Sequence, residues 1–288
     1  MKKGIIPVPQ GGLGNQIFQN IAGYVISEYL NCPLYIYNNT NCNNSHSTQE
    51  YKHTIFKNLG FHVNEPFSNV YNNSELLKEY SFHHLNIFQG FESWNISDVK
   101  EGTILQSYYQ YYPTLEPYEE KIREVILSGL EPHKEKILRE YKEDDLNKSA
   151  FLHVRRGDYL AFSDRHYVQP LSYYKYCIGE LLKQNPDIKQ IYILSDDINW
   201  VRQQELFRHG IFKLYEQEEE VESLTFMSLC KAGSICANST FSWWGAFLGS
   251  HEKRNPVFVP RKWMLTTSEI KLFPKEWNIV EENHISCK

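Results

Sequence analysis

The chain has 288 residues, of which 41% are hydrophobic and 15% aromatic, and 30 Lys and Arg residues against 35 Asp and Glu residues give a net charge of −5. This composition supports the buried core of one large or two medium domains and excludes an intrinsically disordered chain, while the mild acidity and the lack of a basic run disfavour nucleic-acid binding. No apolar stretch approaches the ~20 residues that cross a bilayer, and the amino terminus lacks the apolar region of a signal peptide. We therefore expect a cytoplasmic protein without a transmembrane segment.

The six cysteines are too far apart in the sequence for a metal site or a small disulfide scaffold. A zinc site needs closely spaced ligands such as a Cys-x-x-Cys pair, and none occurs here. Disulfide scaffolds are shorter and richer in cysteine, so we expect mostly free thiols and no bound metal. The cysteines are Cys32, Cys42, Cys177, Cys230, Cys236 and Cys287.

The amino-terminal residues predict a β–α–β unit. Residues 5–8 indicate a short apolar strand, although Pro7 is unusual in a central strand. A Gly-Gly-Leu-Gly-Asn turn follows at 11–15, and apolar residues over 17–30 recur with the period of a helix. Residues 33–37 then predict a second strand.

The middle of the chain contains the predicted domain boundary. Residues 38–50 predict a loop, and the aromatic stretch 51–118 shows no clear period. Two helical patterns near 119–129 and 131–143 lead into an acidic and polar segment, which we interpret as a linker. The predicted domains are 1–148 and 149–288.

The second half of the chain alternates apolar strands with helical patterns of 10–15 residues. This alternation is typical of right-handed crossovers and of a parallel sheet with helices on both faces. The predicted strands are 149–155, 190–195, 211–214, 234–237 and 256–259, and the predicted helices are 172–185, 199–208, 219–231 and 241–250. The sequence thus predicts an α/β fold with two lobes and a cleft between them.

Open parallel sheets bind ligands beyond the carboxyl ends of their strands, and the predicted strand 149–155 ends in charged residues. Arg155 and Arg156 are followed by Gly157 and Asp158. The arginines either form exposed ion pairs or hold a phosphate group. We favour the second interpretation because two guanidinium groups at a strand end suit the geometry of a phosphate.

Asp196 and Asp197 follow the next predicted strand. They can contact a ribose or a base edge, hold a metal, or cap the helix that begins near Asn199. The sequence contains no Asp-x-Asp, a motif often used to hold a metal on a nucleoside diphosphate. We therefore expect Arg155 and Arg156 to neutralise the charge of the phosphate.

A third strand end leads into Asn238, Ser239, Thr240 and Phe241 at the start of a helix. Free N–H groups and hydroxyls at a helix amino terminus bind anions well, although ordinary capping by a serine is the alternative. The two tryptophans at 243 and 244 are interpreted as core residues.

The glycine turn adds Gly12, Gly14 and Asn15 as a fourth loop, which we expect to face the same cleft. Together the four segments predict a site for a nucleoside diphosphate that relies on arginine and backbone amides rather than on a metal.

The four segments stand in the order seen in the α-1,2-fucosyltransferase family (glycosyltransferase family 11), which this sequence resembles over nearly its whole length. The matching residues are Gly-Gly-Leu-Gly-Asn-Gln-Ile-Phe-Gln at 11–19, His-Val-Arg-Arg-Gly-Asp-Tyr at 153–159, Ser-Asp-Asp at 195–197, Ala-Asn-Ser-Thr-Phe-Ser-Trp-Trp-Gly-Ala at 237–246 and Pro-Arg-Lys-Trp at 260–263. One departure is Ser107, where the family often has glycine.

The resemblance implies a GT-B fold of two Rossmann-like lobes, inversion at the fucose carbon and no metal requirement, with GDP-L-fucose as donor substrate and no cofactor. It also implies residue roles. The diphosphate would be contacted by Arg155, Ser239, Thr240 and Phe241, and the guanosine by His153 and Asp196. Asn15 and the turn with Gly12 and Gly14 would cover the phosphate and fucose. The same segments add Arg156, Asp197 and Asn238 to the expected donor site.

Catalysis is expected to involve Arg155, Asp158 and Asn15. Arg155 and the helix start at 239–241 would stabilise the negative charge that develops on GDP. Asp158 either accepts the proton of the acceptor hydroxyl or only orients the arginines, and a dissociative route with little need for a base is the competing mechanism.

The expected partners are GDP-L-fucose and a glycan that ends in galactose, whose 2-hydroxyl accepts the fucose. Nine aromatic residues between 80 and 112 either bind sugar or belong to the core. They are Tyr80, Phe82, Phe88, Phe91, Trp94, Tyr108, Tyr109, Tyr111 and Tyr112. The alternatives are transfer to a protein hydroxyl and a non-catalytic carbohydrate-binding protein. The arginine pair disfavours the latter, because a lectin has no need to bind a diphosphate.

Overall fold

The computed structural model describes residues 3–36, 51–61, 78–85, 91–217, 219–250, 255–265 and 270–286. The chain divides into two compact units, Met1–Glu131 with Lys271–Pro274 and Pro132–Ile270 with Lys275–Lys288. The predicted loop 38–50 lies outside the described residues, as do Cys42, Cys287 and Phe88.

The two units meet in sequence inside helix α5 (Glu119–Glu140), at Glu131 and Pro132, whereas the predicted boundary follows residue 148. The two helical patterns predicted near 119–129 and 131–143 form this single helix, which contains Pro132. The stretch from 132 to 148 belongs to the second unit, with which its backbone forms hydrogen bonds. The amide of Lys231 donates to the carbonyl of Leu146 at 3.2 Å, for example.

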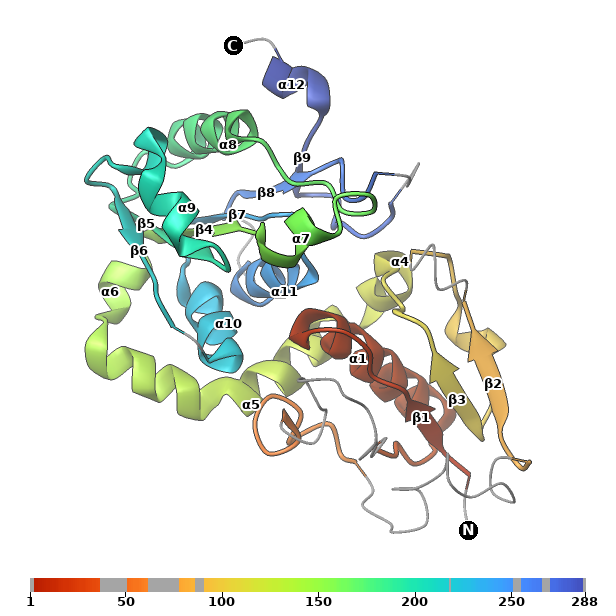
Figure 1. Ribbon diagram of the computed structural model, residues 1–288. Helices are drawn as coiled ribbons and strands as arrows, with labels where there is room; N and C mark the ends of the chain where they lie inside the picture. Colours follow the sequence, from red (N-terminus) through yellow and green to blue (C-terminus); the bar gives the residue numbers. More distant parts are fainter. Residues whose placement is uncertain are drawn as a thin grey trace. The chain divides into compact units, whose positions relative to one another are not determined.

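The first unit contains a three-stranded parallel sheet in the order β1-β3-β2. Its strands are β1 (Ile5–Pro7), β2 (Ser81–His84) and β3 (Thr103–Gln106). Helix α1 (Leu13–Leu30) follows β1, as the glycine turn and the helical period predicted (Figure 1). The strand predicted at 33–37 is wrong in extent, since in the described part it contributes an isolated parallel bridge between Leu34 and Ile5.

The described part of the region 51–118, which showed no clear period, supplies β2, β3 and three short helical elements. These are η4 (Ile96–Asp98), α4 (Tyr112–Leu115) and η5 (Glu116–Tyr118). Strands of four residues and helices of one turn are too short to give a readable hydrophobic period.

The second unit contains a six-stranded parallel sheet in the order β6-β5-β4-β7-β8-β9. Its strands are β4 (Ser149–Val154), β5 (Gln190–Ser195), β6 (Phe212–Leu214), β7 (Gly233–Ile235), β8 (Val257–Pro260) and β9 (Asn278–Val280). Its helical elements are α6 (Glu143–Leu146), α7 (Gly157–Ala161), α8 (Leu171–Gln184), α9 (Ile198–Gln203), η6 (Glu205–Phe207), α10 (Glu220–Leu229), α11 (Thr240–Gly249) and α12 (Glu282–Ser286).

The predicted α/β class is confirmed, since parallel strands connected by helices build both units. All five strands predicted after residue 148 exist within one or two residues of their expected bounds. The helix predicted at 199–208 is interrupted at Gln204 and continues as η6. The cleft expected between two lobes stays a prediction.

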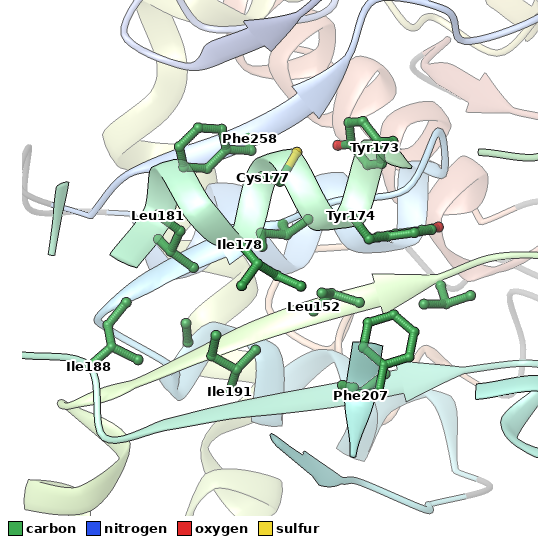
Figure 2. Close-up of a cluster of buried hydrophobic side chains, with 14 of the residues drawn as sticks. Leu152, Tyr173, Tyr174, Cys177, Ile178, Leu181, Ile188, Ile191, Phe207 and Phe258 are labelled. Carbon is green, nitrogen blue, oxygen red and sulfur yellow. The ribbon is translucent and has the colours of Figure 1, made fainter. Parts of the chain in front are cut away.

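The core of the second unit lies between α8 and the sheet. All six residues of β4 are buried, as expected of a central parallel strand covered on both faces. Figure 2 shows Tyr174, Ile178 and Leu181 of α8 pointing toward the strands that carry Leu152 and Ile191. These α8 residues recur at helical spacing, so one face of the helix is buried. Helices α10 and α11 lie on the other face of the sheet (Figure 1).

Candidate active site

Two arginines at the end of β4 meet two aspartates at the end of β5. Nη1 of Arg155 lies 3.1 Å from Oδ2 of Asp196, and Nε of Arg156 lies 3.3 Å from Oδ2 of Asp197. The backbone N–H of Arg156 also donates to Oδ1 of Asp196 at 2.8 Å. Because β4 and β5 are parallel neighbours in register, their carboxyl ends bring all four side chains to one edge of the sheet.

The two arginines differ in how firmly they are held. The guanidinium of Arg156 stacks over the ring of Trp200, 4.0 Å from its centroid, and the side chain is 17% exposed. Arg155 is 32% exposed and lies 5.4 Å from the ring centroid of Tyr159. Arg155 is therefore the more accessible cation. Both arginines form ion pairs here, as one interpretation of the sequence expected, and their role as a phosphate clamp stays a prediction.

The two aspartates also have different roles. Asp197 caps α9, since its Oδ1 accepts from the N–H of Trp200 at 3.1 Å, which confirms the helix-cap interpretation for this residue. Asp196 instead bridges the backbone of Arg156 and the side chain of Arg155. Its carboxylate thus fixes the arginine segment.

Gly157 and Asp158 complete this group. A Cβ atom at Gly157 would lie only 2.7 Å from Oδ2 of Asp196, so glycine permits the close approach of the two strand ends. Oδ1 of Asp158 lies 2.8 Å from Nη2 of Arg155, and the Asp158 side chain is 48% exposed. Asp158 and Asp196 therefore contact different nitrogen atoms of the same guanidinium, Nη2 and Nη1.

Asn238 at the end of β7 joins three segments of the second unit. Its Nδ2 donates to the carbonyls of Tyr167 and Trp263, both at 2.7 Å, and its own carbonyl accepts from the hydroxyl of Tyr159 at 2.8 Å. Burial raises the pKa of Tyr159 to about 12, so the hydroxyl keeps the proton that it donates. The amide of Asn238 is 1% exposed, which indicates a structural role beside the site.

Helix α11 begins after Ser239 without a side-chain cap. The hydroxyl of Ser242 donates to the carbonyl of Ser239 at 3.2 Å, so neither serine caps the N–H groups of the first turn. Thr240 and Phe241 are partly exposed at this helix start. The core interpretation of Trp243 and Trp244 is confirmed, since they are 1% and 0% exposed.

His153 lies inside the sheet rather than on its edge. It is 4% exposed, its Nδ1 has no partner among the described residues, and its ring meets that of Phe241 edge-on at 5.9 Å. Burial, with a smaller contribution from the charge of Arg155, lowers the pKa of His153 to about 3. The imidazole is therefore neutral at physiological pH.

The order of the strands identifies where a ligand of the second unit is expected. Counted from β4, the order β6-β5-β4-β7-β8-β9 reads 3-2-1-4-5-6, the order of doubly wound sheets that bind nucleotides at the point where the direction reverses. That point lies between β4 and β7. Arg155 follows β4 and Asn238 follows β7, so the predicted segments 155–158 and 238–241 flank it.

The glycine turn of the first unit forms a separate, well-braced structure. Gly11 has a φ of +72°, which glycine adopts without strain, and its carbonyl accepts from Nε2 of Gln16 at 3.0 Å. The side chain of Gln19 accepts from the N–H of Gln10 at 2.7 Å. Gly12 precedes α1 and offers no side-chain cap, and Gly14 is buried in its first turn.

Half of the eight described aromatic residues of the 80–112 stretch belong to the core. Tyr80, Trp94, Tyr109 and Tyr112 are buried. Phe82 is 42% exposed and stacks on His84, with ring centroids 5.7 Å apart. Tyr108 and Tyr111 are partly exposed, as is Phe91. Only these four therefore present ring surface to which a sugar has access, among the aromatic residues that the structure describes in this stretch.

Three residues near the arginines were not singled out from the sequence. Tyr159 and Trp200 contact Arg155 and Arg156 as described above. His166 stacks on Tyr159 with ring centroids 4.3 Å apart, and burial lowers its pKa, against the opposing effect of Asp158. Tyr159 lies within the quoted motif at 153–159, whereas Trp200 and His166 have no sequence signal beyond their residue type.

The comparisons with known proteins name the family. The family model described as glycosyl transferase family 11 matches residues 59–280. The chain belongs to this family. The match confirms the resemblance found in the sequence and makes the protein a glycosyltransferase.

Two relatives in Escherichia coli match this family 11 chain over almost their whole length. The chain is 26% identical to "O-antigen biosynthesis glycosyltransferase WbnK", with 93% of this chain and 97% of the relative covered. It is 25% identical to "Alpha-1,2-colitosyltransferase", with 94% and 97% covered. Among solved structures, NodZ α-1,6-fucosyltransferase soaked with GDP-fucose matches with a TM-score of 0.48 and 12% identity, over 86% of this chain and 93% of that chain. In the described part of this glycosyltransferase, no helix has the length and apolar character that a membrane crossing requires.

Proposed function

We propose that this family 11 protein transfers L-fucose from GDP-L-fucose to the 2-hydroxyl of a terminal galactose, with inversion at the fucose carbon and without a metal. Family membership supports glycosyl transfer. The relative named for α-1,2-colitosyl transfer, whose match spans 94% of this chain, supports the 1,2 linkage. The motifs at 153–159 and 237–246 support GDP-fucose as the donor.

The observation that carries the proposal is the position of Arg155 beside the reversal point of the six-stranded sheet. Arg155 directly follows β4. Strand β7 lies next to β4 in the sheet, and the start of α11, which has no side-chain cap, follows β7. A diphosphate between them would receive a guanidinium on one side and backbone N–H groups on the other. Asp196 and Gly157 hold the arginine segment in place for this contact.

The reaction breaks the bond between the fucose anomeric carbon and the β-phosphate oxygen, and that oxygen keeps the electron pair. The 2-oxygen of galactose forms the new bond from the opposite face of the fucose ring, and its proton leaves to a base or to water. Negative charge grows on GDP as the bond breaks, and Arg155 with the α11 start would stabilise it. This kind of electrostatic term is usually the largest in such reactions.

Asp158 is proposed mainly as a residue that orients Arg155. Its carboxylate already accepts from the guanidinium at 2.8 Å. In this role the Asp158 carboxylate contacts the guanidinium and does not take the proton of the acceptor hydroxyl. Proton removal from the acceptor would then come late, after most of the fucose–phosphate bond has broken.

We assign donor binding to the second unit, which contains the predicted donor domain 149–288 apart from residues 271–274, and acceptor binding to the first unit. The arginines and the start of α11 support the assignment of donor binding. The assignment of acceptor binding is supported by aromatic rings that are exposed at least in part, because aromatic faces pack well against the C–H surface of a sugar. These rings belong to Phe82, Phe91, Tyr108 and Tyr111.

The proposal is tested by mixing the purified protein with GDP-L-fucose, EDTA and a panel of galactosides, and by following GDP release and product mass. We expect GDP release to require a galactoside and to persist in EDTA. Proton NMR of the product should show an α-linked fucose on the galactose 2-oxygen. Loss of turnover in EDTA that added divalent metal restores would contradict metal independence.

Two further arms separate the alternatives. GDP-colitose in place of GDP-L-fucose tests the sugar that one relative is named for, and faster turnover with it would replace fucose as the donor. A folded protein acceptor tests transfer to protein hydroxyls. Absence of GDP binding by calorimetry would favour a non-catalytic carbohydrate-binding protein and would end the proposal.

A further inference from the structure

Tyr159 connects the segment after β4 with the segment after β7. It lies in the short helix α7, directly after Asp158. Its hydroxyl donates to the carbonyl of Asn238 at 2.8 Å, between residues that are 79 positions apart in the chain. Because β4 and β7 are neighbouring parallel strands, this hydrogen bond spans the point where the strand order of the sheet reverses.

The ring of Tyr159 lies beside Arg155. Cζ of Arg155 is placed over this ring, 5.4 Å from its centroid, and the negative face of an aromatic ring attracts a guanidinium. The ring of His166 stacks on Tyr159 with an interplanar angle of 11° and centroids 4.3 Å apart, which restricts rotation of the tyrosine side chain. Tyr159 therefore meets Arg155 with its ring and the segment after β7 with its hydroxyl.

Both ends of the segment 159–167 are attached to Asn238. At the start, the Tyr159 hydroxyl donates to the Asn238 carbonyl. At the end, the carbonyl of Tyr167 accepts from Nδ2 of Asn238 at 2.7 Å. The residues between them, 160–165, are all exposed, so they supply little packing that could hold α7 in place. The attachment at Asn238 thus fixes the turn that follows the arginines.

Ring contacts alone do not explain a tyrosine at this position, because a phenylalanine would make the same contacts with Arg155 and His166. The hydroxyl adds the bond to Asn238, which is 1% exposed, so water has little access to its carbonyl. Burial raises the pKa of Tyr159 to about 12, and the hydroxyl therefore donates over the whole pH range of ordinary assays.

The position of Tyr159 has a consequence for a ligand that contacts both strand ends. In the proposed function, a diphosphate lies between Arg155 and the start of α11, which begins after Ser239. A ligand gains most from two contacts when their spacing is set before it binds, since no further ordering is then needed. Tyr159 lies against Arg155 and bonds the residue before Ser239, so it sets this spacing.

We propose that Tyr159 is a positioning residue that fixes the spacing between Arg155 and the start of α11, and that this spacing is what makes the site bind a diphosphate. The inference rests on the proposed function, in which these two groups hold the donor diphosphate. Every residue in it belongs to the second unit. Tyr159 acts through the two groups that it positions.

The test is calorimetry of the full chain with GDP and with guanosine. Tyr159→Phe keeps the ring and removes the bond to Asn238, so the Kd for GDP should rise about fivefold, the effect of one hydrogen bond. The Kd for guanosine, which has no phosphate, should change less than about twofold. In an Arg155→Ala background, Tyr159→Phe should change the Kd for GDP less than about twofold, because the spacing no longer matters once one of the two contacts is gone.

Tyr173→Phe is the matched control. The hydroxyl of Tyr173, a core residue of α8, donates to the carbonyl of Cys236 at 2.6 Å, so this variant also removes a bond from a tyrosine to the segment after β7. It leaves the contact with Arg155 untouched. We expect its Kd for GDP to stay within about twofold of the wild type, and thermal melts of both variants compare their losses of stability.

Four results would overturn the inference. An unchanged Kd for GDP in Tyr159→Phe would reduce the residue to packing, and an equal rise for guanosine would indicate a general distortion of the site. An equal rise for GDP in Tyr173→Phe would show that any loosening of the segment after β7 weakens binding. The same fivefold effect in the Arg155→Ala background would show that Tyr159 acts independently of Arg155.

Failure of the proposed function is recognised separately. If the wild type binds GDP, the variants behave as expected and no fucose is transferred, the transfer reaction is wrong and the role of Tyr159 stands. If the wild type does not bind GDP at all, both the proposed function and the inference are wrong.

Discussion

Asp196 and Arg155 form an ion pair across the ends of two adjacent parallel strands, with 3.1 Å between Oδ2 and Nη1. The other oxygen of Asp196 accepts from the backbone N–H of Arg156. One carboxylate therefore fixes both the side chain and the backbone of the segment that we propose to bind the donor diphosphate.

Replacement of Arg155 by alanine should nearly abolish turnover. The loss of a cation that stabilises developing charge is comparable to the loss of an oxyanion-hole donor, at about 3–4 kcal/mol or roughly 10²–10³ in kcat. Arg202→Ala is the matched control, because Arg202 forms an exposed pair with Glu216 in the same unit. Initial rates of GDP release measure both variants. A folded Arg155→Ala protein with half the wild-type rate would contradict the assignment.

Replacement of Gly157 by alanine should weaken GDP binding. The new Cβ would lie 2.7 Å from Oδ2 of Asp196, so the aspartate must move and release Arg155. We expect the Kd for GDP, measured by calorimetry, to rise about tenfold, the effect of losing a charge-assisted hydrogen bond. Gly179→Ala is the control, since a Cβ at this exposed position of α8 meets nothing within 4 Å. An unchanged Kd in Gly157→Ala would show that Asp196 is dispensable for the arginine geometry.

Asp158 should act by orienting Arg155, so its substitution should lower kcat equally at all pH values. Asp158→Asn keeps an oxygen that accepts from Nη2 of Arg155 and should be less impaired than Asp158→Ala. The measurement is kcat from pH 5.5 to 9 for both variants. Disappearance of an acidic limb of the wild-type profile in Asp158→Asn would instead identify Asp158 as the general base.

His153 should make the free energy of unfolding depend on pH below 6.5. Burial lowers its pKa in the folded protein to about 3, against 6.5 for an unperturbed histidine. Between these values the unfolded chain binds a proton and the folded protein does not. The contribution of the neutral imidazole is thus complete above pH 6.5 and is lost as the pH falls toward 3, by up to about 1.4 kcal/mol per pH unit.

Urea unfolding of the wild type and of His153→Asn at pH 7.5, 6.5 and 5.5 measures this dependence. The wild type should lose about 1.4 kcal/mol more than the variant by pH 5.5. The comparison isolates His153, because His83 and His166 also have lowered pKa values and are present in both proteins. Equal pH slopes in the two proteins would show that His153 is hydrated in the folded state.

Several elements of the fold were predictable because they are long and strongly periodic. The apolar run before Arg155 predicted β4, and the apolar residues at helical spacing predicted α8. Both predictions lie within one residue of the observed bounds. The short elements between 51 and 118 were not predictable, since β2 and β3 have four residues each and their partners are distant in sequence. The end of the first unit was also missed, because the polar residues after α5 resemble a linker although their backbone bonds to the second unit.

In the candidate site, too, some features could be predicted from the sequence and others could not. Residue types alone indicated that Arg155, Arg156, Asp196 and Asp197 belong to a phosphate-binding edge, because parallel strands place their carboxyl ends together. The sequence left open which aspartate caps a helix and which braces the arginines. The answer depends on contacts of about 3 Å between residues that are some 40 positions apart in the chain.

By itself, the amino-acid sequence determined the α/β class, the order of the motifs and the family, since these depend on local period and on residue identity. Only the tertiary structure decided that His153 is buried and that Asn238 connects three segments of the second unit. Burial and hydrogen-bond partners are properties of distant segments brought together, and no local pattern records them. The mild negative charge and the abundance of aromatic residues were therefore weak guides to the site, whereas a few buried polar contacts define it.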